Sequence, residues 1–547
     1  MPREERLDWV FFNGKIITLD AEDTIGQAVA IKNNRIVAVA KGPGEEEKWI
    51  SVNGVRRFDL RGKTLLPGLI DPHTHLGMAT LSFRYYVDGR CPPNRSIHDI
   101  LERIRQRTQE TPKGGWIIVH ASMFGDQKLR EKRYPTKEEL DRVAPEHPVA
   151  LLSSVHARIV NTCALRSAGI TGTTPEPPGG HIEKDPNTGN PTGVLRECNQ
   201  ILPIPPFTYE QVKETLQEMI AEYWVKQGYT SVSSFADALE FRVYQELLKE
   251  GRLPVRVQSM IMNLFNRPEI QESLARLGIL PGFGNDRLKM GGVKIFVDGA
   301  FMGLSAATHD PYLNMPTGDY RGLLKFQDPG VLNDLVLAGH EAGLQLCVHA
   351  IGDKAQDLAL DAYEYALKRS PKPHRHRLEH FGNELTSRER IRRAKEMDLI
   401  PVPSIEWLFA YGDFIEPYLG PARRDQSFLL RSMIDAGLKP ANCSDTCGTE
   451  PLSVNPFFSI WCAVTRQTFF GKKLLPEEGI SVREALRMYT THAAYSGFEE
   501  DQKGSIEAGK FADLIVIDRD ILTIPEEQIK NIRVEMTMID GRIVYQR

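Results

Sequence analysis

Two histidines stand one residue apart at the end of a short apolar stretch, LLPGLIDPHTHLG, at residues 65–77. Residues 65–70 are apolar and include a proline and a glycine, which is typical of a buried strand rather than a helix. Because alternate side chains of a strand share a face, Asp71, His73 and His75 would point the same way. Two imidazoles on one face form a bidentate clamp, so this stretch is a candidate metal site.

Other residues able to serve a metal site end apolar stretches further along the chain. In MGGVKIFVDGA, Lys294 lies on the opposite face from the neighbouring valines and isoleucine. His349 ends LQLCVH, His380 follows HRHRLE, and Asp445 follows ANCS. One such residue could occur by chance. Together with the strand that ends in His73 and His75, however, five strand ends carry suitable residues, which indicates a single site.

The elements around these residues predict the frame that positions them. Apolar strands alternate with helical stretches such as DPGVLNDLVLAGHEAG and SVREALRMYTTHAAYSG, a pattern typical of a parallel sheet. We therefore predict an α/β fold, a TIM-like (β/α)8 barrel, in which catalytic groups lie at the C-terminal ends of the strands. The strands would end near these residues: His73, Ser234, Met262, Val297, His349, His380, Ser404 and Ser444.

Both ends of the chain have the texture of short antiparallel strands joined by tight turns. We predict that residues 1–66 and 500–547 together form a small β-sandwich domain beside a barrel domain at 67–499. Residues 80–215 contain proline-rich and glycine-rich stretches and extra strands that the barrel does not need. They are predicted to form a large insertion after the first barrel strand, and we expect it to cover the barrel mouth and set substrate choice.

Composition excludes several classes of protein. The chain has 547 residues, of which 41% are hydrophobic and 26% charged, as in an ordinary globular protein. A net charge of −4 and the lack of a basic stripe argue against nucleic-acid binding, and no apolar stretch could span a bilayer. Seven scattered cysteines do not suggest a disulfide framework. We expect a cytoplasmic protein, since no signal-peptide core is seen, with a small-molecule substrate and a homodimeric state.

These motifs resemble those of the amidohydrolase superfamily of metal-dependent hydrolases, over nearly the whole chain. The sequence is more closely similar to amidohydrolase family 3, the branch that contains N-substituted formamide deformylase. The matching stretches are LPGLIDPHTH, HARIVNTCALRSAGI, GGHIEKDPNTGNPTGVLRE, VKIFVDGA, HAIGD, RLEHFGN and AVTRQ. The terminal β-sandwich and the insertion also agree with this resemblance.

The resemblance implies roles for the residues at the strand ends. His73 and His75 would hold the more buried metal ion together with Asp445, and His349 and His380 would hold a second ion. The implied cofactor is one or two Zn²⁺ ions, which neutral imidazoles and a carboxylate suit.

Lys294 needs a separate explanation, because an ammonium group cannot ligate a cation and is costly to bury unpaired. In this superfamily such a lysine is often carboxylated by CO₂, and the resulting carbamate can bridge two metal ions. The alternative is a structural lysine paired with a nearby acid such as Asp298.

The implied reaction is hydrolysis of a carbon–nitrogen bond, in an amide or N-acyl group of a small, partly apolar substrate. The metal would activate water and polarise the carbonyl, while Asp445 would act as the catalytic general base and then protonate the leaving nitrogen. A decarboxylase or other lyase on the same scaffold is an alternative, and a non-catalytic regulatory relative is another. A deaminase is disfavoured, because Gly352 stands where deaminases of this fold usually carry a glutamate.

Five residues are candidates for substrate binding: His156, Glu197, Phe301, Trp407 and Arg466. The first two match family stretches in the insertion and the last matches AVTRQ, with a structural role as the alternative for each. Phe301 and Trp407 replace groups that often face the substrate in the family. We therefore expect an intact metal centre in a remade pocket.

Overall fold

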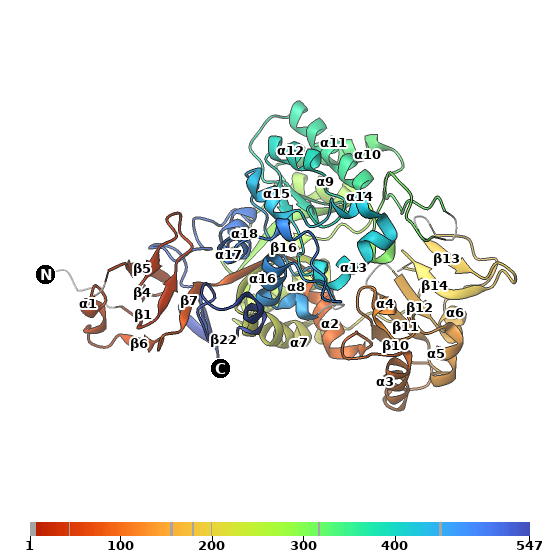
Figure 1. Ribbon diagram of the computed structural model, residues 1–547, viewed down its shortest axis with the longest axis horizontal. Helices are drawn as coiled ribbons and strands as arrows, with labels where there is room; N and C mark the ends of the chain where they lie inside the picture. Colours follow the sequence, from red (N-terminus) through yellow and green to blue (C-terminus); the bar gives the residue numbers. More distant parts are fainter. Residues whose placement is uncertain are drawn as a thin grey trace.

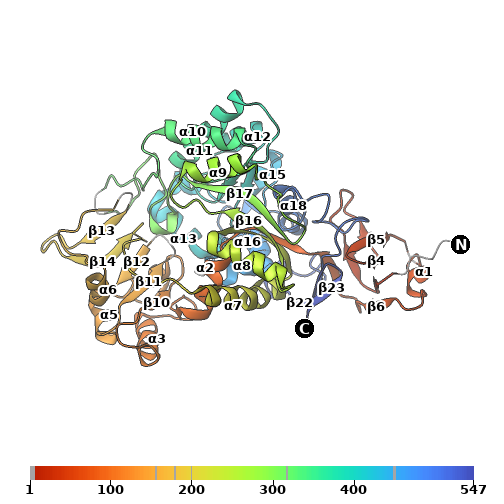
Figure 2. The ribbon, with the colours of Figure 1, turned by 180° about the vertical axis from the view of Figure 1, so that it is seen from behind.

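Three groups of elements are seen in the computed structural model, which describes residues 7–42, 44–153, 157–177, 180–198, 200–315, 318–447 and 451–547. In both ribbon views a central barrel separates sheets formed by the two ends of the chain from a further sheet on the other side (Figures 1 and 2).

The central sheet is parallel throughout and nearly closes into a barrel. Within the described residues it has seven strands, in the order β20-β19-β18-β17-β16-β15-β8. Their bounds are β8 Leu69–Thr74, β15 Tyr229–Ala236, β16 Arg256–Ile261, β17 Leu288–Phe296, β18 Leu346–His349, β19 Arg377–Glu379 and β20 Ile400–Val402. The predicted TIM-like barrel is therefore confirmed, with its strands in chain order.

The segment 441–445 lies between the two edge strands of this sheet. The backbone N–H of Ala441 donates to the carbonyl of Pro401, while that of Asp445 donates to the carbonyl of His73. The Ser444 hydroxyl also donates to the Asp71 carboxylate at 2.6 Å. The eighth predicted strand thus lies in its expected place and bonds to both edges, but residues 441–445 do not form a regular strand.

Helices follow the barrel strands and bury one face against them. In α10, Pro329–Glu341, the buried residues include Leu332, Leu335 and Val336, at the i, i+3, i+4 spacing of one helix face. The other helices of this layer are α8 Ala238–Lys249, α9 Pro268–Leu277, α11 Asp353–Arg369, α12 Arg388–Glu396, α13 Trp407–Leu419, α14 Pro421–Arg424, α15 Leu430–Asp435, α16 Pro456–Thr465, α17 Val482–Met488 and α18 Thr491–Ser496.

Between β8 and β15 the chain forms a second, mixed sheet in the order β13-β14-β12-β11-β10-β9. Its strands are β9 Val87–Asp88, β10 Ile117–His120, β11 Val149–Ser153, β12 Ala157–Val160, β13 His181–Lys184 and β14 Pro191–Arg196. The helices of this part are α2 Leu76–Tyr85, α3 Ile97–Glu110, α4 Gly125–Lys128, α5 Lys137–Val143, α6 Thr162–Ser167 and α7 Tyr209–Met219. In Figure 1 this sheet is the orange and yellow part.

The two ends of the chain form two sheets that share one hydrophobic core. The first contains β1 Trp9–Phe12, β4 Ala28–Lys32, β5 Arg35–Ala40 and β6 Arg56–Asp59, with α1 Glu47–Ile50 beside it. The second contains β2 Lys15–Ile17, β3 Ile25–Gly26, β7 Thr64–Pro67, β21 Leu514–Ile517, β22 Val534–Ile539 and β23 Arg542–Gln546.

The prediction of one strand over residues 65–70 is wrong in one respect. β7 ends at Pro67 and β8 begins at Leu69, and the two strands belong to different sheets. At Gly68, between them, a Cβ would lie 2.3 Å from the side-chain oxygen of Thr230, so glycine permits an approach that other residues would block.

The structure also bears on the expectations about disulfides and membrane-spanning segments. All seven cysteines lie in the described part of the chain, and none of them is paired in a disulfide. Within the same part, the helices are too short or too polar to cross a membrane.

Candidate metal centre

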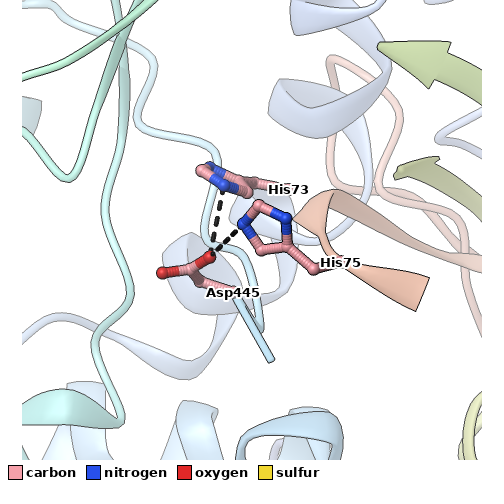
Figure 3. Close-up of side chains that lie close together, drawn as sticks. All are labelled: His73, His75 and Asp445. Carbon is pink, nitrogen blue, oxygen red and sulfur yellow. Dashed lines mark ion pairs between the residues drawn. The ribbon is translucent and has the colours of Figure 1, made fainter. Parts of the chain in front are cut away.

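Three side chains from the two edges of the barrel converge in Figure 3: His73, His75 and Asp445. His73 lies in β8, His75 directly precedes α2, and Asp445 ends the segment that joins the barrel edges. Oδ1 of Asp445 lies 3.2 Å from Nε2 of each histidine, and the three potential ligand atoms lie within 4.8 Å of one another. The three residues could therefore contact a single bound ion.

The orientation of His73 is fixed by a buried hydrogen bond to a carboxylate that the sequence analysis missed. Nδ1 of His73 lies 2.6 Å from Oε2 of Glu379, and both side chains are fully buried. Arg377 donates hydrogen bonds to both oxygens of Glu379 and to the carbonyl of Pro72. Burial, followed by the charge of Lys294, holds the pKa of His73 well below its usual range, so the ring is neutral. Nδ1 therefore carries the proton, and Nε2 presents a lone pair.

This arrangement fits a divalent cation. The lone pair of His73 Nε2 and the carboxylate of Asp445 are both acceptors, and they face each other at 3.2 Å. Nδ1 of His75 is buried and has no hydrogen-bond partner among the described residues. Two imidazole nitrogens and a carboxylate oxygen form a ligand set suited to a divalent metal ion.

Lys294 lies beside the same centre. It is 1% exposed, and its Nζ is 3.2 Å from His73 Nε2 and 4.4 Å from the ring centroid of Phe235. Burial lowers the pKa of Lys294. Asp298, the acid considered as its partner, accepts hydrogen bonds from the backbone N–H groups of Ala307, Ile351 and Gly352.

The other two predicted histidines line the next part of the barrel wall. His380 follows β19 in a left-handed conformation (φ 68°), and its Nδ1 lies 3.8 Å from Oδ2 of Asp445. Its ring stacks on Trp407, with centroids 5.2 Å apart and planes at 11°. His349 ends β18, its ring centroid is 4.7 Å from that of His380, and its Nε2 is 2.8 Å from the carbonyl of Gly299. The structure thus places the six predicted metal-site residues around the same end of the barrel.

A cavity of about 640 Å³ opens onto these residues. Trp407 and Glu197, two of the predicted substrate-binding residues, contribute to its lining. Met123, Arg158 and Gln200 also line it, from the segment between β8 and β15. Part of this segment therefore lies at the cavity beside the predicted metal ligands, while its bounds and its role in substrate choice stay predictions.

Two other predicted substrate-binding residues lie away from this cavity. Phe301 is 1% exposed and packs against Phe124 and Tyr411, with ring centroids 5.3 Å and 5.5 Å away. Arg466 is fully buried at the end of α16, where its Nε donates to the carbonyl of Leu474. Neither is among the described residues that line the cavity. The remaining candidate, His156, lies outside the described residues.

Two features around the site escaped the sequence analysis for different reasons. Arg377 and Glu379 alternate on one strand directly before His380, so strand periodicity would have placed both on one face. Arg158 carried no such signal, because only the pairing of β12 with β11 and β14 places it in the wall beside the cavity.

Comparison with known proteins agrees with this geometry. The sequence profile described as "Amidohydrolase family" matches residues 56–545. N-substituted formamide deformylase of Arthrobacter pascens is 31% identical, and the alignment covers 99% of this chain and 98% of that protein. The putative amidohydrolase YtcJ of Bacillus subtilis (strain 168) is 30% identical, and the alignment covers 98% of this chain and 99% of that protein.

A solved structure from Pyrococcus furiosus, described as an uncharacterized metal-dependent hydrolase, shares this fold. The two chains are 26% identical and superpose with a TM-score of 0.70. The superposition covers 94% of this chain and all of the other.

Proposed function

Since this chain belongs to the amidohydrolase family, we propose that it is a metal-dependent hydrolase of a carbon–nitrogen bond, in an amide or N-acyl group. The observation that carries the proposal is the convergence of His73, His75 and Asp445 at a cavity of about 640 Å³. Such a volume suits a small, partly apolar organic substrate.

The proposed cofactor is one or two Zn²⁺ ions. His73, His75 and Asp445 would hold one ion, and His349 and His380 would hold the other. We further propose that Lys294 is carboxylated and that its carbamate would serve as a ligand shared by the two ions; its Nζ lies 3.2 Å from His73 Nε2, beside the proposed ligands. When bound, a divalent ion lowers the pKa of water and polarises a substrate carbonyl.

The protein's own groups have distinct tasks in this proposal. Asp445 accepts a proton from the attacking water and passes it to the leaving nitrogen. Glu379 and Arg377 keep His73 in the tautomer with a proton on Nδ1. Trp407 stacks on His380 and limits its rotation. Apolar residues of the cavity exclude water around the substrate.

A lyase such as a decarboxylase remains the second candidate, because one barrel supports many chemistries. A regulatory relative without activity is disfavoured by the intact set of ligand residues around Asp445. Gly352 precedes α11 and donates its backbone N–H to Asp298, so this position carries no acid for deamination.

The experiment is a product analysis on purified, metal-loaded protein. N-substituted formamides, other N-acyl amines and N-acyl amino acids would be supplied, and released amine, carboxylate and CO₂ measured separately. We expect amine and carboxylate to be released in equal amounts. Release of CO₂ without hydrolysis would favour the lyase, and no turnover of any amide would contradict the proposed function.

We also propose a domain division that follows the sheets. Residues 1–66 and 500–547 would form one β-sandwich, 67–499 the barrel domain and 80–215 its insertion. The shared core of the two terminal sheets supports this division. The homodimeric state and the cytoplasmic location stay predictions.

A further inference from the structure

The loop between β16 and α9 presents two large apolar side chains at the cavity. Leu264 is 49% exposed and Phe265 is 53% exposed, and both line the same cavity as His75 and Asp445. Met78, which is 37% exposed, lines it too. Single exposed apolar side chains are common on protein surfaces, but three that line one cavity form a surface suited to an apolar ligand.

Hydrogen bonds from two asparagines hold this loop in a defined shape. Oδ1 of Asn263 accepts the backbone N–H of Arg267 at 2.8 Å, and its Nδ2 donates to the carbonyl of Arg267 at 3.0 Å. Asn266, whose backbone is left-handed (φ 52°), bonds in the same way to both backbone groups of Phe296 in β17. Leu264 and Phe265 lie between the two asparagines, so the loop that presents them is already ordered before a ligand binds.

Neighbouring apolar residues of the cavity lining belong to elements that carry proposed metal ligands. Met78 lies in the first turn of α2, three residues after His75, and Met262 directly follows β16. Phe296, to which the loop is bonded, also lines the cavity, and its ring centroid lies 5.1 Å from Nζ of Lys294. We call this set of residues the apolar wall: Met78, Met262, Leu264, Phe265 and Phe296. Methionine side chains in such a wall can adapt to ligands of different shape.

Two ionisable side chains adjoin the apolar wall. The guanidinium of Arg267 lies 5.3 Å from the ring centroid of Phe265, a cation–π contact that still leaves this side chain 53% exposed. Glu240 packs against Gly77, the neighbour of Met78, so closely that a Cβ on this glycine would overlap the carboxyl group. Burial raises the pKa of Glu240 well above its usual range, so the group is uncharged at neutral pH. A neutral acid and a cation over an aromatic ring are both compatible with an apolar ligand.

We propose that Leu264 and Phe265 are specificity-determining residues, which bind an apolar group that adjoins the scissile amide of the substrate. This inference rests on the proposed hydrolase function and adds the residues that select among its substrates. Each methylene group that leaves water on binding strengthens affinity by roughly fourfold. Because the two asparagines already order the loop, little of this gain is lost in fixing its conformation.

Matched ligands that cannot be hydrolysed as amides test the inference by binding to the metal-loaded protein. N-hexylmethanesulfonamide and N-ethylmethanesulfonamide carry the apolar chain on nitrogen, whereas N-methylhexanesulfonamide and N-methylethanesulfonamide carry it on the side of the acyl group. Calorimetry should show, in at least one of these two series, that the wild-type protein binds the hexyl compound at least about tenfold more tightly than the ethyl compound.

Leu264→Ala/Phe265→Ala should reduce this preference to below about threefold, because the chain then leaves less water-exposed surface behind on binding. Both side chains are exposed, so the metal content and the midpoint of thermal unfolding should stay close to those of the wild type. The control is Leu277→Ala/Phe283→Ala, at side chains that are 72% and 69% exposed and are not among the described residues that line the cavity. This control should keep the preference.

Turnover of the corresponding amides, N-hexylformamide and N-methylhexanamide, separates this inference from the proposed function. Leu264→Ala/Phe265→Ala should raise KM for the amide that is hydrolysed and leave kcat nearly unchanged. Equal binding of the hexyl and ethyl compounds in both series would overturn the inference while leaving the hydrolase proposal intact. So would a preference that survives the double substitution, which is the result expected if the two side chains serve a protein partner instead. A binding preference without hydrolysis of either amide would count against the hydrolase proposal alone.

Discussion

At the scale of single residues, the chemistry of this centre depends on which nitrogen of His73 carries the proton. The buried Glu379 accepts from Nδ1 and is itself held by Arg377, so Nε2 faces Asp445 and Lys294. Such outer carboxylates orient the imidazole and increase its basicity as a ligand. The position of the proton on His73 thus follows from contacts on β19, far along the sequence.

Asp445→Asn should reduce kcat by several orders of magnitude while the folded protein keeps most of its metal. The amide retains an oxygen that can contact an ion but cannot accept the proton of water, and general base catalysis contributes about 10²–10⁴-fold. Activity and metal content would be measured on one sample. Asp237→Asn is the control, since Asp237 lines the same cavity and asparagine also caps helices well. Near-wild-type turnover of the Asp445 variant would exclude the base role.

Lys294→Ala should lose both metal and activity, with partial rescue by acetate or formate. A buried lysine with a lowered pKa can react with CO₂ as the neutral amine, and the carbamate would replace a repelled cation by a ligand. A small carboxylate can enter the space that the shortened side chain leaves. Lys325→Ala, at another lysine of the cavity, should retain its metal. Full metal content in the Lys294 variant would contradict the bridging role.

At the scale of the elements, the sequence predicts the barrel strands because they are short apolar runs that end in polar residues. Prediction is poorer where contacts between segments far apart in the sequence determine where a strand begins or ends. Gly68, between β7 and β8, lies so close to Thr230 that a Cβ would meet its side-chain oxygen at 2.3 Å, and segment 441–445 is held in place by bonds to both barrel edges. Neither contact leaves a local pattern in the sequence.

The cavity wall was the least predictable part of the site. Phe301 was a reasonable candidate, since it follows the strand of Lys294, yet its ring turns into an aromatic cluster with Phe124 and Tyr411. Its neighbours Ala300 and Met302 line the cavity instead. The direction of a side chain in an irregular loop depends on packing that periodicity does not describe.

Exchanging residues 80–215 for a relative's segment should change which amides are cleaved and leave the metal content unchanged. This segment contributes Met123, Arg158 and Glu197 to the cavity, whereas the metal cluster lies on barrel elements. The ratios of kcat/KM over a set of amides and the metal content would be compared. An exchange limited to α3, which does not contribute described residues to the cavity, should leave the ratios as they were. If the larger exchange left the kcat/KM ratios unchanged, the segment would not determine specificity.

At the scale of the whole molecule, the barrel is joined to the C-terminal strands by buried charges at Arg256. Its Nε donates to Asp513 at 2.7 Å, just before β21, and its Nη2 contacts Asp513 and Asp540. Burial raises the pKa of Asp540, but the charge of Arg256 and its hydrogen bond, together with Arg287, outweigh it and leave the pKa lowered. The terminal strands are thereby anchored to β16, away from the metal centre.

Arg256→Met should destabilise the fold without changing metal content, because it leaves the buried Asp513 carboxylate unpaired. Breaking such a pair costs about 3–5 kcal/mol, so the midpoint of thermal unfolding at neutral pH should fall. Arg256 also lowers the pKa of Asp540, and a carboxylate of this kind contributes stability above its unfolded pKa that is lost as the pH falls through its folded pKa. The difference between wild type and variant should therefore narrow below about pH 4. Arg287→Met, which leaves the contacts of Arg256 with Asp513 in place, should shift the midpoint less. A shift that is the same at every pH would show that packing at Arg256, rather than its charge, joins the two parts.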